Sequence, residues 1–242
     1  MLEVVHLSFS YGAHRVLDDV TFDVAPGEIV GVTGSNGAGK TTLLRVLASL
    51  LMQDEGDIRL DNVDPLARPI KYRRGIGYLS EYCPLYNEMT VEDYLTYRVR
   101  LKGERNLRVR RRVGETLEMC GLDAVRKSRV RPLSHGFRKR LGLADALVLH
   151  PKLLLLDDPL AGLDVPHRKK MAAVLTAASA RSAIVLAGHE IFEMLDWCTR
   201  FIVLHEGHIV GAYRVSEFKK PDLARILERQ IGTGEEDEEA FA

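Results

Sequence analysis

The sequence predicts an α/β fold, in which a mixed sheet carries an antiparallel β subdomain and a helical lobe is inserted into the core. Stretches rich in Val, Ile and Leu recur along the chain and are typical of strands. Strands alternate with helical spacing in the second half, whereas no convincing strand occurs between about 88 and 150. The 242 residues, 46% of them hydrophobic, suffice for one domain, or one domain with a lobe.

The strand-like stretches share a high content of branched apolar residues. They cover 2–8, 20–24, 28–33, 57–60, 75–80, 152–157, 182–187, 200–204 and 208–212. The first sixty residues predict antiparallel β structure, and the second half predicts parallel β–α units. Helical spacing occurs at 39–51 and from 165 to 198, and VEDYLTYRVRLKG, VRRRVGETLEMCG and FRKRLGLADALVL predict the helices of the lobe.

These patterns divide the chain into a core at 1–215, with the lobe at about 88–150, and two terminal pieces. We expect a helical extension at 216–230. The acidic segment 231–242 is rich in Glu and contains Gly, so we expect it to be disordered.

Composition excludes several classes of protein. Lys and Arg together number 34, as do Asp and Glu, and this balance argues against a dedicated nucleic-acid binder. Cys83, Cys120 and Cys198 lie far apart, which fits neither a disulfide framework nor a zinc site. No apolar run approaches the roughly 20 residues of a membrane span, and no signal peptide is expected. We therefore expect a cytosolic protein.

Basic residues are concentrated in the lobe, at 98–112 and again at 126–131. One interpretation is a solvated helix face, which is the usual role of such a run. The alternative is a surface that meets an acidic partner or anionic lipid headgroups.

The segment GSNGAGKT, from Gly34 to Thr41, matches the phosphate-loop pattern, and it lies between the strand-like EIVGVT and the helical TTLLRVLASL. Glycines allow the close backbone approach that phosphate oxygens need, and the helix start adds its positive dipole end. Lys40 is suited to neutralise β- and γ-phosphate charge, and the Thr41 hydroxyl to bind Mg²⁺. The chain is thus expected to bind a nucleoside triphosphate. The expected nucleotide-binding residues of this segment are Gly34, Ser35, Asn36, Gly37, Ala38, Gly39, Lys40, Thr41 and Thr42.

Two carboxylates follow the apolar run LLLLDDP at 153–159. The run predicts a buried parallel strand, so Asp157 and Asp158 emerge at its carboxyl end, where ligands bind in open α/β sheets. We expect Asp157 to hold Mg²⁺ and Asp158 to face the attacking water.

The order of these motifs resembles the ATP-binding subunits of ABC transporters. LSHGFRKRLGLADAL at 133–147 is similar to the family signature, AGLD follows LLLLDDP, and a His follows the strand-like SAIVLA. The resemblance covers about residues 1–215. It implies the P-loop NTPase fold of an ABC ATPase, with ATP and Mg²⁺ as ligands.

The resemblance also implies roles for individual residues. Tyr11 would stack on adenine. Glu81 would bind Mg²⁺ together with Thr41 and Asp157, and Asp158 and His189 would be catalytic. The residues that would contact the ATP of an opposite subunit are Ser134, His135, Gly136 and Phe137 of the signature, and Asp164 would occupy the D-loop position.

Within the family, the segments at 76–95 and 133–147 resemble the ABC-2 exporter branch, in particular the gliding-motility type of ATPase subunit. This similarity implies a head-to-tail dimer around ATP, of two copies or with a related subunit. It also implies separate membrane permease subunits, export, and a location on the cytoplasmic face of the membrane. No nucleic-acid partner is expected.

The sequence departs from the family pattern in three places. Asp158 stands where a longer Glu is usual, Glu81 where Gln is usual, and the signature reads LSHGF rather than LSGGQ. A carboxylate misplaced by about 1 Å can cost a large factor in rate, so hydrolysis is expected to be slow. Two alternatives remain open: an ABC-type ATPase acting on nucleic acid or ribosomes, and a regulatory module with little turnover.

Overall fold

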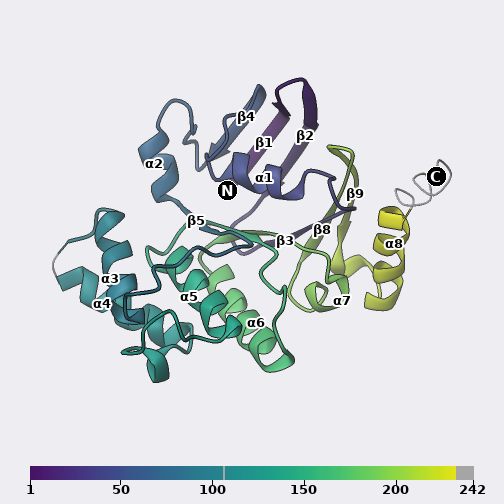
Figure 1. Ribbon diagram of the computed structural model, residues 1–242. Coiled ribbons are helices and arrows are strands. Elements are labelled where there is room, and N and C mark those ends of the chain that lie inside the picture. The colour runs from purple at the N-terminus through teal and green to yellow at the C-terminus, as the bar shows by residue number, and fades with distance from the viewer. Residues whose placement is uncertain (106, 233–242) are drawn as a thin grey trace.

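The computed structural model describes residues 1–105 and 107–232. A three-stranded sheet lies above a six-stranded sheet in the view of Figure 1, and most of the helices lie below the larger sheet. Helix α1 lies between the two sheets, whereas α3 and α4 form a lobe to one side. This arrangement is the α/β fold with an antiparallel subdomain and a helical lobe that the sequence predicts.

The smaller sheet is antiparallel throughout. It contains β1 (Leu2–Tyr11), β2 (His14–Val24) and β4 (Glu55–Leu60), with β1 in the centre. Leu2 pairs with Val24 on one side and with Leu60 on the other, and all three are buried. The prediction of antiparallel structure near the start of the chain is confirmed for these strands.

The larger sheet has the order β5-β6-β7-β3-β8-β9, and only its last pair is antiparallel. The bounds of its strands are β3 Ile29–Thr33, β5 Ile76–Leu79, β6 Leu153–Asp157, β7 Ala183–Ala187, β8 Arg200–His205 and β9 His208–Arg214. Every residue of β3 is buried, as expected for a strand covered on both faces. The prediction of antiparallel β over the first sixty residues is therefore wrong for β3.

Helices connect these strands and build the lobe. Their bounds are α1 Lys40–Leu47, α2 Pro69–Arg74, α3 Val91–Leu101, α4 Leu107–Met119, α5 His135–Leu147, α6 Val165–Ser179, α7 Ile191–Met194 and α8 Lys220–Gly232, with 3₁₀ turns at Asp123–Val125 and Val215–Glu217. The three predicted lobe helices are present as α3, α4 and α5. The helical spacing over 165–198 belongs to two helices, because the chain leaves α6 to form β7. Helix α2 was not expected, since it is a single short segment beginning at a proline.

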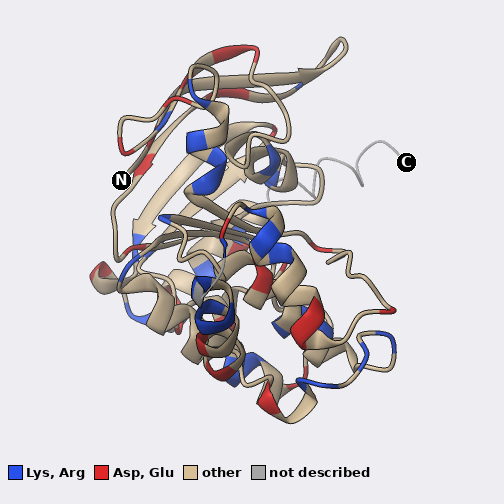
Figure 2. Cartoon of the chain, turned by 90° about the vertical axis from the view of Figure 1, so that its left-hand side faces the viewer, with Lys and Arg blue, Asp and Glu red and all other residues tan. Residues whose placement is uncertain are grey.

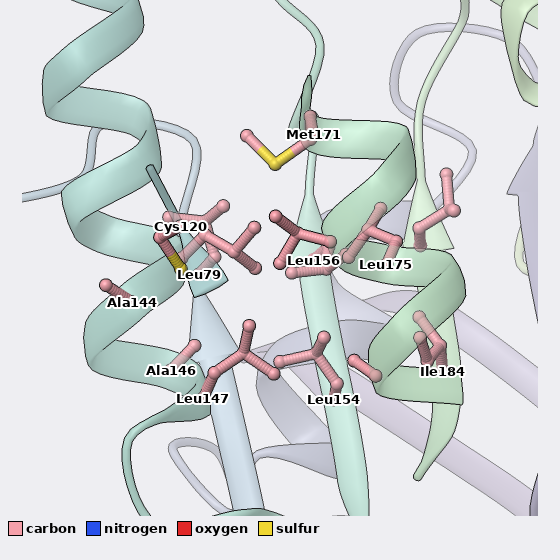
Figure 3. Packing of buried hydrophobic residues seen from close by; sticks show 14 of the residues in the cluster. Leu79, Cys120, Ala144, Ala146, Leu147, Leu154, Leu156, Met171, Leu175 and Ile184 are labelled. Atoms are coloured by element: carbon pink, nitrogen blue, oxygen red, sulfur yellow. The ribbon is translucent and has the colours of Figure 1, made fainter. Parts of the chain in front are cut away.

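Apolar side chains form one core on each face of the larger sheet. Figure 3 shows the lower core, where Leu154 and Leu156 of β6 lie between the side chains of α5 and α6. Leu223 and Leu227 of α8 belong to the same core, so this helix packs against the main body. Of the segment 231–242 that was predicted to be disordered, Ile231 and Gly232 are the last residues of α8, so the prediction is wrong for these two, and 233–242 lie outside the described residues.

A buried ion cluster joins α3 to α5 within the lobe. Asp145 is 9% exposed; Arg98 Nε donates to its Oδ2 over 2.9 Å, and Lys102 Nζ donates to its Oδ1 over 2.8 Å. The Tyr94 hydroxyl also donates to Asp145, over 3.3 Å. Burial raises the pKa of Asp145, but the Lys102 and Arg98 charges outweigh it and hold this pKa below its ordinary value.

We predict that Asp145→Ala lowers the free energy of unfolding by about 3–5 kcal/mol, because it leaves two cations without their buried partner. The depressed carboxyl pKa means that this contribution is present at neutral pH and is lost as the pH falls through that pKa. Urea unfolding at neutral and acidic pH measures both effects. Glu118→Ala, on the exposed face of α4, is the control and should change stability by less than about 0.5 kcal/mol. A loss below about 1 kcal/mol for Asp145→Ala would contradict the prediction.

Candidate nucleotide site

The phosphate loop lies between β3 and α1, where the sequence places it. Gly39 is the N-cap of α1 and has a left-handed φ of 104°, and Gly37 has a φ of 81°. A Cβ on Gly34 would lie 2.0 Å from the carbonyl oxygen of Leu204 in β8. The loop therefore needs glycine for its backbone angles and, at position 34, for its close approach to the sheet.

Lys40, the first residue of α1, bends back over the loop. Its Nζ donates to the carbonyl oxygens of Gly34, at 2.7 Å, and Ser35, at 2.8 Å. Burial lowers the pKa of Lys40, and the charges of Asp158 and Asp157 oppose this effect. The ammonium is thus held at the loop by neutral carbonyl oxygens. A charged phosphate oxygen is a stronger hydrogen-bond acceptor and can take their place.

Asp157 ends β6 next to the start of α1. Its Oδ1 accepts a 2.9 Å hydrogen bond from the Thr41 hydroxyl, and its Oδ2 accepts one of 3.5 Å from Tyr78. Burial raises the pKa of Asp157, as do the charges of Glu81 and Asp158, while the bond from Thr41 and the charge of Arg45 lower it. The raised pKa means that the ionised form of Asp157 is disfavoured in this buried site, and a cation bound beside Asp157 would stabilise that form.

These residues share one cavity of about 270 Å³. Its lining is Val16, Asn36, Gly37, Gly39, Lys40, Thr41, Thr42, Glu81, Asp157, Asp158, Ala187, Gly188 and His189. The residues predicted to hold Mg²⁺, which are Thr41, Glu81 and Asp157, are therefore together. Hydroxyl and carboxylate oxygens are the donors that Mg²⁺ prefers beside phosphates, so the residues present fit the ion.

Asp158 and His189 approach each other across the ends of β6 and β7. His189 Nδ1 lies 3.2 Å from Asp158 Oδ2, and its Nε2 lies 3.7 Å from Glu190 Oε1. Asp158 Oδ1 and Glu190 Oε2 are buried and have no hydrogen-bond partner among the described residues. The two predicted catalytic residues are thus in contact, and Glu190, which sequence reasoning missed, adds a second carboxylate to the imidazole.

The predicted signature residues lie outside this cavity, at the start of α5. Ser134 is the N-cap, and its hydroxyl accepts from Phe137 N over 3.5 Å. The Nε2 atom of the exposed His135 side chain donates to the carbonyl oxygen of Ala161 over 3.0 Å, so this ring is hydrogen-bonded to the segment after β6.

The predicted D-loop residue, Asp164, is the N-cap of α6 and accepts hydrogen bonds from the backbone and ring of His167. That ring lies against Gly136, where a Cβ would come within 2.3 Å of it, and stands edge-on to Phe137. Gly136 is thus needed for this close contact. No local signal in the sequence pointed to His167, because the contact joins two segments that are 31 residues apart.

Tyr11, the predicted adenine-stacking residue, lies at the end of β1 and is 46% exposed. It is not among the residues that line the cavity, and its ring stands edge-on to Phe9. Burial lowers the pKa of Arg45, but hydrogen bonds with Tyr11 and Tyr78 help to raise this pKa above its ordinary value. Because Arg45 belongs to α1, Tyr11 lies beside that helix. Its role in adenine binding stays a prediction.

Acidic neighbours pair with many arginines of the basic lobe, and Figure 2 shows the two signs of charge interspersed over it. These pairs are Arg98–Asp145, Arg111–Glu115, Arg112–Glu104, Arg126–Glu92 and Arg129–Glu88. This pairing favours the solvated-face interpretation over a strongly basic docking surface.

Comparison with known proteins agrees with this geometry. A family model described as "ABC transporter" matches residues 17–161, which is more than half of the chain. The chain belongs to the ABC transporter family. Within the described residues, no helix has the length and apolar character needed to cross a bilayer.

Individual relatives of this ABC protein match over most of their length. An uncharacterized ABC transporter ATP-binding protein of Bacillus subtilis (strain 168), YxlF, is 34% identical over 94% of this chain and 75% of that protein. The lipopolysaccharide export system ATP-binding protein LptB of Haemophilus influenzae is 33% identical over 87% of this chain and 89% of its own length. A solved ATP-binding subunit of an ABC transporter superposes with a TM-score of 0.84 at 28% identity, covering 94% of this chain and 99% of that one.

We predict that Gly34→Ala abolishes nucleotide binding and lowers the melting temperature by several degrees, because its methyl group would collide with the backbone of β8. Gly37→Ala is the matched control. No atom lies within 4 Å of a Cβ at that position, so only the left-handed φ adds a cost, of about 1–2 kcal/mol. Binding of a fluorescent ATP analogue and thermal unfolding measure the two variants. Equal losses of melting temperature in both would show that the close approach to Leu204 is unimportant.

Proposed function

We propose that this chain binds and hydrolyses Mg²⁺-ATP, and that this reaction drives transport through separately encoded membrane permease subunits. The observation that carries the proposal is the single cavity in which Lys40, Thr41, Asp157, Asp158 and His189 meet. A phosphate loop alone supports nucleotide binding. The carboxylates and the histidine at the same cavity add the groups that orient water and metal for phosphoryl transfer.

In this proposal Asp158 accepts the proton of the attacking water, and His189 holds the water and the γ-phosphate. The 3.2 Å contact between the two side chains supports a shared role. Thr41, Asp157 and Glu81 would hold Mg²⁺, which would supply charge neutralisation at the phosphates. Asp158 is one methylene shorter than Glu, so we expect the turnover of the isolated chain to be slow.

We further propose that ATP is bound between two subunits arranged head to tail. The signature residues lie outside the cavity of their own chain, which supports a role at the nucleotide of a partner. Ser134 caps a helix of 13 residues whose amino end suits a phosphate. In this chain the His167 ring lies on Gly136, so phosphate binding at that helix start would require the ring to move.

A groove of about 620 Å³ supports the proposed permease contact. It lies between the segment after β5 and helix α3, and aromatic residues line it, including Tyr82, Tyr86 and Tyr94. Tyr82 is 84% exposed, and Tyr86 is 50% exposed. Exposed aromatic rings around a groove are suited to hold an apolar helix of a partner, and Glu81 links this groove to the nucleotide cavity.

Export is the direction that we propose. The resemblance of 76–95 and 133–147 to the ABC-2 exporter branch supports it. Among the alternatives, the nucleic-acid ATPase is disfavoured by the paired arginines of the lobe. The protein would then lie at the cytoplasmic face of the membrane through its permease.

We predict that the purified chain releases phosphate from Mg²⁺-ATP above the level of Lys40→Ala, because only the native side chain supplies a cation at the phosphate loop. A coupled phosphate assay measures the rate, and omission of Mg²⁺ should return it to that of the variant. If the chain binds ATP without turnover even when its permease is present, the regulatory-module alternative is correct instead.

We predict that Asp158→Asn lowers kcat by about a hundredfold or more, since the amide cannot accept a proton. Asp158→Glu restores the reach of the longer carboxylate and should raise kcat. Single-turnover phosphate release with saturating ATP measures both. A rate in Asp158→Asn equal to that of the native chain would assign the base to another group.

A further inference from the structure

We propose that Lys139, on the signature helix α5, is a positioning residue that fixes the backbone of Glu81 and of Asp158 relative to each other at the nucleotide cavity. Its ammonium donates to the carbonyl oxygen of Glu81 over 2.9 Å and to that of Asp158 over 3.1 Å. Three elements that are far apart in the sequence therefore meet at one nitrogen atom. The inference rests on the proposed ATPase function.

Burial gives this contact its significance. Lys139 is 2% exposed, although it carries a long and charged side chain. Removing an ammonium from water costs several kcal/mol unless polar groups replace its hydration. Here backbone carbonyls do so, and both belong to residues whose side chains line the cavity. If Lys139 served only to fill space in the core, an apolar side chain of similar length would serve equally well.

The backbone of Asp158 needs such support. It has a left-handed φ of 46°, a conformation that non-glycine residues adopt at a cost of order 1–3 kcal/mol and only when their surroundings impose it. The amide of Asp158 donates to the carbonyl oxygen of Ala187 in β7 over 2.9 Å, and its own carbonyl accepts from Lys139. Asp158 is thus held from both sides, which directs its carboxylate toward His189.

Close packing prevents α5 from sliding relative to these carbonyls. A Cβ on Gly142 would lie 2.1 Å from Cys83 Sγ, and a Cβ on Gly77 of β5 would lie 2.2 Å from the carbonyl oxygen of Ala146. The helix backbone therefore touches β5 and the segment that follows it. A fixed helix makes Lys139 a fixed donor, so the positions of Glu81 and Asp158 are set relative to the signature.

Lys139→Met tests the proposal, because it keeps the length of the side chain and removes the donor and the charge. We expect kcat to fall about tenfold or more while the Kd for ATP stays within about twofold, since the phosphate loop is untouched. Amide hydrogen exchange should accelerate in segments 80–87 and 157–163. Lys139→Gln, which is neutral, is the second variant if Met does not fold; kcat should again fall several-fold.

Lys102→Met is the matched control. Lys102 is also a largely buried lysine that donates to a backbone carbonyl, that of Asp145, but it lies in the lobe and does not line the nucleotide cavity. The Lys102→Met variant should be less stable than the native chain, but its kcat and its amide hydrogen exchange at 80–87 and 157–163 should be unchanged. A native kcat in Lys139→Met, or losses in both variants that follow their melting temperatures, would overturn the proposal.

The exchange experiment separates this inference from the proposed function. If the chain shows no turnover above Lys40→Ala even when its permease is present, the ATPase proposal fails, and exchange at 80–87 and 157–163 still decides whether Lys139 holds these segments. Unchanged exchange in Lys139→Met would overturn the inference even in an active enzyme.

Discussion

The site depends on one constraint, the parallel pairing of β5, β6, β7 and β3. Parallel neighbours deliver their carboxyl ends to the same edge of the sheet. Glu81, Asp158 and His189 each follow one of these strands, and the phosphate loop follows β3. Because β3, β6 and β7 are buried along their whole length, the polar groups that follow them are confined to this edge, where the chain leaves the sheet. Residues more than a hundred positions apart thereby come to line one cavity.

Electrostatics at this edge then decide what it can hold. Asp157, Asp158 and Glu81 bring three carboxylates to the cavity, and burial raises the pKa of Asp157. Lys40 is the basic residue in the lining that lies at the phosphate loop, and its ammonium is bound to loop carbonyls. A magnesium–nucleotide complex matches both features, because its cation meets the carboxylates while its phosphates meet the ammonium and the loop amides.

The sequence predicted what depends on local pattern. Uninterrupted apolar runs indicated the strands, and GSNGAGKT indicated both the loop and the elements on either side of it. Contacts between distant segments carry no such pattern. The positions of His167 over Gly136 and of Lys139 between two carbonyls follow from how α5 and α6 pack, which periodicity does not encode. The placement of β3 was missed for a related reason, since its buried run is compatible with either sheet.

Helix α5 connects the lobe, the larger sheet and the nucleotide cavity. It binds α3 through Asp145, so it belongs to the lobe, and its backbone also touches β5 and the segment after it so closely that Gly77 and Gly142 admit no side chain. Its first turns carry the signature residues and Lys139. Helix α5 is thus the element that joins the lobe to the carbonyls of Glu81 and Asp158. A partner seated in the groove beside Tyr82 would press on that same helix and segment, which gives the nucleotide cavity a direct mechanical link to the surface of the lobe.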